Sequence, residues 1–191
     1  MVEKSKLDKD KKGKTMDPSH YHGMIGILLH LTASRPDLQF AICICAQYQA
    51  RPTKKHLHAV KGIFRYLRGI VNHGLWYLKD SSIVLTSFTD ADHASFQDTR
   101  CSTTGSMQFL GDRLVSWSSK RLKHIDIRFH FIKDHVKYGV IELYFVNMKY
   151  QLADIFTKAL GRERIEFLIN KLGMRCFTPK TLKQLADEVE E

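Results

Sequence analysis

The sequence predicts a mixed α/β chain in which a helical segment precedes a sheet flanked by helices. Apolar residues recur at helical spacing through the first third of the chain. Short β-rich runs separated by turn residues fill the middle. A helix, a strand and one or two further helices then follow. This order predicts one helical unit and one sheet-containing unit.

The N-terminal part begins with a lysine- and aspartate-rich stretch without apolar periodicity, so we expect residues 1–15 to be disordered. Helical spacing predicts a helix over residues 21–31 and a second over 38–49, separated by a break at Pro36. Pro52 and Thr53 open a third helix. These elements make residues 16–70 a helical segment.

The third helix is amphipathic. Leu57, Val60, Phe64 and Leu67 form its apolar stripe. Four cations recur on another face: Lys54, Lys61, Arg65 and Arg68. A solvated face on a packed helix accounts for such a pattern, and contact with nucleic-acid phosphates is the alternative.

Strands are predicted at residues 75–78, 83–88, 106–110 and 114–118. A helix is predicted at 125–136, a strand at 141–146, and one or two helices from 151 to 172, ending at Gly173. Residues 74–174 therefore form the second unit. The acidic remainder, 175–191, is expected to be a frayed tail.

The composition favours a polyanionic partner. The formal net charge is +10 and the pI is about 9.5, and most of this charge lies in the foldable part of the chain. No apolar run is long enough to cross a bilayer, and no apolar run follows the N-terminal lysines as it does in a secretory signal. We therefore expect no membrane association and an intracellular location, cytoplasmic or nuclear, with reduced cysteines.

Several runs of this sequence resemble the C-terminal part of copia-type retrotransposon Pol polyproteins. YHGMIGILLHLT (21–32) and SRPD (34–37) resemble the segment that closes the reverse transcriptase, and HLHAVK (56–61) with RYLRG (65–69) resembles the helix that links it to the next domain. Six further runs resemble the family's RNase H domain: FTDADHA (88–94), STTG (102–105), FLG (109–111), VSWSSK (115–120), KHIDIRFHFI (123–132) and QLADIFTK (151–158). The resemblance implies a truncated RNase H-like fold, with a mixed sheet flanked by helices, behind a helical reverse-transcriptase segment.

The sequence departs from the family after the third RNase H strand. In the family a helix with a Ser-Thr-Ala-Glu-Ala-Glu-Tyr motif follows, and then a strand ending in a Cys-Asp-Asn motif. Neither motif is present, so the resemblance implies an internal deletion near residues 121–123. The three-stranded meander should persist, while the strand at 141–146 either pairs beside the first strand or stays loose.

The family's reaction is cleavage of the RNA strand of an RNA·DNA hybrid at carboxylates that hold two divalent cations about 3.5–4 Å apart. The resemblance implies that Asp90 and Asp154 are the remaining catalytic, metal-binding carboxylates, and that two others are missing. Asp92, Asp126 and Asp134 are the candidates to replace them, but nothing in the sequence places them in the pocket. We expect Mg²⁺ or Mn²⁺, the family's cofactor, not to bind stably.

Three functions remain open at this point. The first is ribonuclease H activity, the second is binding of RNA·DNA hybrid or DNA backbone without catalysis, and the third is a pseudogene-like product without a selected role. Without the resemblance, Asp90 and Asp154 are turn or helix-cap residues. The missing carboxylates favour a remnant that has lost its activity.

Overall fold

The computed structural model describes residues 7, 10, 12–77, 82–92, 102–122, 136–139, 142 and 144–187. Its first third is helical, as predicted, with α1 (Pro18–Leu31), η1 (Pro36–Leu38), α2 (Gln39–Ala46) and α3 (Lys54–Gly69). Asp17 caps α1 by accepting a hydrogen bond from the Ser19 amide. At the start of α3 the Thr53 amide donates to Nδ1 of His56.

The three helices share one apolar core, formed by Tyr21, Ile25, Leu28, Leu38, Ile42, Cys45, Val60 and Ile63. The Tyr21 hydroxyl donates a 2.8 Å hydrogen bond to the Cys45 carbonyl, which ties α1 to α2 inside this core. Leu7 packs against the same core, and its carbonyl accepts a hydrogen bond from the Tyr48 hydroxyl. Most of the stretch predicted to be disordered lies outside the described residues.

Burial makes Cys45 a poor nucleophile. Desolvation raises the pKa of its thiol to about 11, so at about pH 8 only about one molecule in a thousand carries the reactive thiolate. We expect iodoacetamide to alkylate the exposed Cys176 much faster than Cys45. Peptide-resolved mass spectrometry checks this, with both rates measured again in urea. Equal rates in the folded chain would contradict it.

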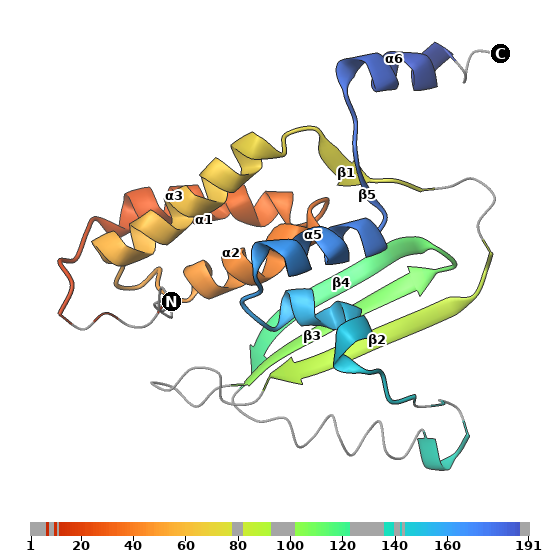
Figure 1. Cartoon of the computed structure of the whole chain (residues 1–191). Helices are drawn as coiled ribbons and strands as arrows, with labels where there is room; N and C mark the ends of the chain where they lie inside the picture. Colours follow the sequence, from red (N-terminus) through yellow and green to blue (C-terminus); the bar gives the residue numbers. More distant parts are fainter. Residues whose placement is uncertain are drawn as a thin grey trace.

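The sheet is an antiparallel meander of β2 (Leu85–Asp92), β3 (Ser102–Leu110) and β4 (Arg113–Leu122), in the order β2-β3-β4. This confirms the predicted three-stranded arrangement. Figure 1 shows η3 (Leu152–Phe156) and α5 (Arg162–Lys171) lying across one face of the sheet. A second core fills that interface, formed by Met107, Phe109, Leu114, Ala153, Ile155, Phe156, Leu168, Ile169, Leu172 and Met174.

The first predicted strand lies elsewhere in the structure, and the prediction of a frayed C-terminal tail was wrong. The prediction was 75–78, whereas β1 (His73–Leu75) begins and ends earlier and pairs antiparallel with β5 (Met174–Cys176). The tail that we expected to fray contains β5 and the helix α6 (Pro179–Asp187), which extends away from the sheet in Figure 1. Gly173, with φ +74°, ends α5 as predicted and turns the chain into β5.

The predicted strand at 141–146 is not formed in its described residues. Residue 142 and residues 144–146 have no regular structure, and Phe145 is 97% exposed. A short strand without a neighbouring strand leaves its backbone N–H and C=O groups unpaired, so the β preference of its residues is not sufficient to form it. The predicted helix at 125–136 lies almost wholly outside the described residues, and η2 (Met148–Tyr150) follows the loose segment.

The helical segment packs against the sheet along β4. The Trp117 indole donates a 2.9 Å hydrogen bond to the Thr32 carbonyl at the end of α1, and the Cys43 thiol lies 3.4 Å from the Ser119 carbonyl. Tyr66 packs against both cores. Across the described ranges, no helix has the length and apolar character required to traverse a bilayer.

Candidate functional site

Asp90 and Asp154, the two carboxylates singled out from the sequence, lie close together in the folded chain. Asp90 is near the end of β2 and pairs in register with Gly105 of β3. Asp154 lies in η3, which packs directly over Gly105: a Cβ atom there would lie 2.6 Å from Cβ of Phe156. The Ser119 hydroxyl also holds η3 by donating to the Phe156 carbonyl at 2.7 Å. A glycine in β3 therefore allows the two carboxylates to approach.

A lysine side chain lies between the two carboxylates. Nζ of Lys158 is 2.6 Å from Oδ1 of Asp154 and 3.2 Å from Oδ2 of Asp90. The Thr157 hydroxyl donates to Oδ2 of Asp90, and the Arg164 guanidinium lies 3.5 Å from Oδ2 of Asp154. The pair of carboxylates is therefore neutralised by cations of its own chain.

The charge of Lys158 is stabilised in this setting. Burial lowers its pKa, but the hydrogen bonds and charges of Asp154 and Asp90 outweigh this, so the pKa is raised above its ordinary value of 10.5. Since the folded-state pKa is the higher one, this contribution to stability is complete below about pH 10.5 and is lost as the pH rises through the folded pKa.

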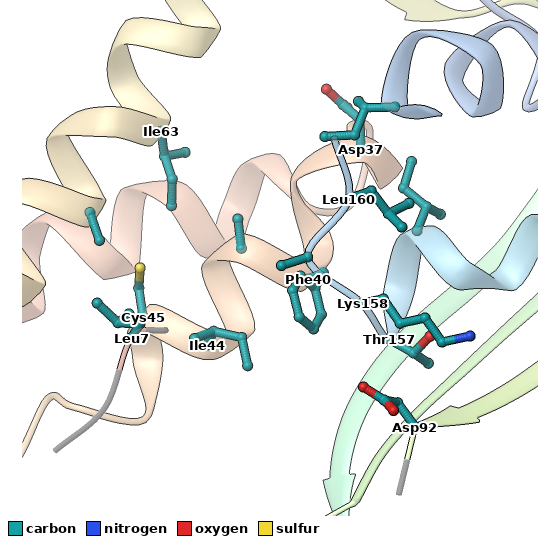
Figure 2. Close-up of a pocket in the computed structure, with 15 residues that line it drawn as sticks. Leu7, Asp37, Phe40, Ile44, Cys45, Ile63, Asp92, Thr157, Lys158 and Leu160 are labelled. Atoms are coloured by element: carbon teal, nitrogen blue, oxygen red, sulfur yellow. The ribbon is translucent and has the colours of Figure 1, made fainter. Parts of the chain in front are cut away.

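An apolar pocket of about 520 Å³ lies next to this ion cluster. Figure 2 shows Phe40 and Ile44 of α2 on one side, with Thr157, Lys158 and Asp92 at one end. The pocket separates α2 from the loop that follows η3.

The basic helix α3 exposes the cations that its sequence places on one face: Lys54, Lys61, Arg65 and Arg68. Val60 of the predicted apolar stripe is buried, together with Ile63, while the other three predicted positions are only partly buried: Leu57, Phe64 and Leu67. His58, which the sequence analysis did not single out, is exposed on the same face. Within the described ranges none of these four cations forms an ion pair, so their donors are free to bind a ligand.

Relatives of this chain are found among transposon proteins. It is 29% identical over 228 residues to the retrovirus-related Pol polyprotein from transposon RE1 of Arabidopsis thaliana, which covers 87% of this chain and 16% of the polyprotein. The corresponding polyprotein from transposon RE2 of the same plant is 28% identical over 236 residues, covering 91% of this chain and 16% of the polyprotein. Over most of its length this chain is therefore similar to the retrovirus-related Pol polyproteins of transposons. The resemblance to copia-type Pol is thereby confirmed.

A relative shorter than the polyproteins matches part of this chain at higher identity. An uncharacterised mitochondrial protein of Arabidopsis thaliana, AtMg00810, is 40% identical over 108 residues, covering 56% of this chain and 45% of the relative. No family model matches this chain, and no solved structure matches it. The chain spans only about a sixth of the length of the two polyproteins.

The residues of this chain do not fit a divalent metal site. Mg²⁺ requires about six oxygen ligands at about 2.0–2.1 Å, and the Lys158 ammonium lies where a cation shared by Asp90 and Asp154 would bind. Within the part of the chain that the structure describes, no group of three or more histidine, cysteine or acidic side chains could hold a metal ion. Asp126 and Asp134 lie outside the described residues.

The sequence indicated the two carboxylates of this site but not their partners. Lys158 and Thr157 both lie within the QLADIFTK run. The spacing could have indicated the first of them, because Asp154 and Lys158 are four residues apart, as in a helical ion pair. No sequence pattern indicated Arg164, because its approach to Asp154 depends on how α5 packs.

Proposed function

We propose that this Pol chain is a remnant that binds nucleic-acid backbone through α3 and no longer cleaves RNA. The observation that carries the proposal is the exposed row formed by Lys54, Lys61, Arg65 and Arg68 on one face of α3, which has no ion-pair partner among the described residues. Cations without carboxylate partners can neutralise phosphates and release counterions, without regard to base sequence. The net charge of +10 acts in the same direction.

The structure of the carboxylate pair supports the loss of cleavage. A two-metal reaction needs a cluster of open carboxylates, whereas Asp90 and Asp154 are paired with Lys158. The comparisons support a deletion as its origin: the alignments with both polyproteins, 228 and 236 residues long, exceed the 191 residues of the chain. The relatives therefore contain residues that have no counterpart here, which agrees with a missing helix and strand.

Binding is tested with a labelled RNA·DNA hybrid of about 20 base pairs and the matching DNA duplex, by anisotropy across a salt series. Changing Lys54, Lys61, Arg65 and Arg68 to glutamine is expected to weaken binding to both duplexes at least about tenfold and to reduce the salt slope by about one per lost phosphate contact. The control removes four exposed cations from elsewhere: Lys120, Lys171, Lys180 and Lys183.

The control variant should retain most of the affinity. Equal losses in both variants would mean that net charge alone drives binding and that α3 has no special part in it. A folded chain that binds neither duplex would contradict the binding proposal and favour a product without a selected role.

The same hybrid, incubated with Mg²⁺, tests the loss of cleavage. We expect no RNA cleavage by the chain or by its Asp90→Asn variant. Cleavage by the unmodified chain alone would show that another carboxylate completes the site, and the catalytic half of the proposal would be wrong.

A further inference from the structure

A second pocket, of about 430 Å³, lies where the β1–β5 pair meets the start of β2 and the turn between β3 and β4. Tyr77, which follows β1, holds this junction by donating a 2.8 Å hydrogen bond to the Leu114 carbonyl of β4. Phe88 and Phe109 line one side, with their rings edge to face and 5.9 Å apart, and Trp76 lines the pocket just after β1. The pocket has the size of a small-molecule site and shares no lining residue with the apolar pocket beside α2.

The lining of this second pocket carries two cations and one acid. The Arg175 guanidinium lies over the Trp76 ring, 5.7 Å from its centroid, and Lys171 is the last residue of α5. Both cations are exposed, and neither forms an ion pair within the described ranges. Asp112 is the acid, and it has an interaction of its own. Two positive charges and one negative charge give the lining a net charge of +1, so it favours an anion.

Two uncharged polar side chains also line the second pocket, the Asn170 amide and the Thr86 hydroxyl. Neither has a hydrogen-bond partner in the part of the chain that the structure describes, so both are available to a ligand. An amide donates and accepts hydrogen bonds at the same time, which suits the edge of a nucleobase. The pocket therefore offers aromatic rings, an amide and two cations to one ligand.

We propose that the second pocket binds a single unpaired nucleotide, with the base against Trp76 and the phosphate at Lys171 and Arg175. Stacking on aromatic side chains tolerates any base, and ammonium and guanidinium groups form charge-assisted hydrogen bonds with phosphate. A nucleotide joins a flat aromatic ring to an anion, which is the combination that this lining can hold. The proposal goes beyond the duplex binding proposed for α3, because it concerns another surface and a base that is not paired.

Calorimetric titration of the full chain with adenosine monophosphate (AMP) tests the proposal, beside titrations with adenosine and with ribose phosphate. We expect AMP to bind at least about fivefold more tightly than either part, because stacking and phosphate contact each contribute. Replacing Lys171 and Arg175 together with glutamine should weaken AMP binding at least about fivefold, and adenosine binding by less than about twofold. Both side chains are exposed, so this variant should fold.

Two controls separate the second pocket from general charge and from α3. Replacing Lys180 and Lys183, exposed lysines of α6, with glutamine removes the same charge and should leave AMP binding unchanged. The α3 variant that lacks its four cations should also bind AMP as the unmodified chain does. A failure of α3 to bind duplex would therefore be visible separately from a failure of this pocket to bind AMP.

The nucleotide has two sources, a free nucleotide or the single-stranded end of a bound strand. Anisotropy with a blunt duplex and with the same duplex carrying a short overhang distinguishes them. Tighter binding of the overhang that is lost without Lys171 and Arg175 assigns the pocket to strand ends, and equal binding of both duplexes assigns it to free nucleotides. A folded chain that binds no AMP, that binds AMP no more tightly than ribose phosphate, or that loses as much affinity in the α6 variant overturns the proposal.

Discussion

Replacing Asp37 with leucine is expected to destabilise the folded chain by about 3–5 kcal/mol, because it leaves a buried guanidinium without its counter-ion. The Asp37 side chain is 0% exposed and that of Arg35 is 8% exposed. Nε and Nη2 of Arg35 donate to the two carboxylate oxygens at 2.9 and 2.7 Å, a bidentate pair. Urea denaturation monitored by tryptophan fluorescence measures the loss.

The surroundings of the Arg35–Asp37 ion pair explain its expected effect on stability. Nη1 of Arg35 donates to the Ile70 carbonyl at 3.3 Å, just after α3, so the pair connects η1 to the end of that helix. Burial, followed by the charge of Asp37, raises the pKa of the neighbouring Tyr66 hydroxyl. Without Asp37, little water could reach the Arg35 guanidinium to compensate for the lost ion pair.

The matched control replaces both partners, as Arg35→Met with Asp37→Leu. Exchange of a buried ion pair for apolar residues of similar volume is often close to neutral, so the double variant should recover most of the lost stability. Glu166→Ala, which breaks the exposed pair with Arg162, should change stability by less than about 1 kcal/mol. A single Asp37→Leu variant that is as stable as the unmodified chain would contradict the argument.

Gly105→Ala is expected to destabilise the chain by about 1–3 kcal/mol, a large effect for one added methyl group. The new Cβ would lie 2.6 Å from Cβ of Phe156, 2.9 Å from Cγ2 of Thr157 and 3.2 Å from the Ala153 carbonyl oxygen. The first two atoms stand close to the backbone, so η3 must move away from β3. Differential scanning fluorimetry measures the change in melting temperature.

Gly62→Ala in α3 is the matched control, since it makes the same chemical change in open space, with no atom within 4 Å of the new Cβ. Alanine is the better helix former, so this variant should be more stable by up to about 1 kcal/mol. Opposite signs for the two glycines are the expected result. A neutral Gly105→Ala would mean that η3 does not pack on β3 as the structure has it.

Local pattern was sufficient for most elements because their sequences signal their own boundaries. Asp17 and Pro18 start α1, Pro52 and Thr53 precede α3, and Gly173 stops α5. The strand prediction at 141–146 and the frayed tail failed for one shared reason. Whether a short strand forms depends on a neighbour, and β5 has one in β1, whereas residues 144–146 have no strand partner in the described part of the chain.

In the candidate site too, the sequence predicted some features and only the structure showed others. The motif around Asp90 and the QLADIFTK run singled out two carboxylates that the structure brings together, and helical spacing indicated that four cations share one face of α3. The sequence treated Pro36 and its neighbours only as a break between helices, whereas the structure makes Arg35 and Asp37 a buried ion pair. Arg35 also donates a hydrogen bond to the carbonyl of Ile70, 35 residues away in the sequence, and no local pattern reveals such a contact.

By itself, the sequence determined the family, the helical first third, the meander and the identity of two carboxylates, because these follow from residue order and periodicity. Only the tertiary structure decided that Lys158 lies between Asp90 and Asp154 and that Gly105 must lack a side chain. Both facts depend on how η3 packs against β3, which brings together residues about fifty positions apart. Packing of that kind is decided by the shape and charge of the assembled surfaces, and neither can be obtained from a single segment.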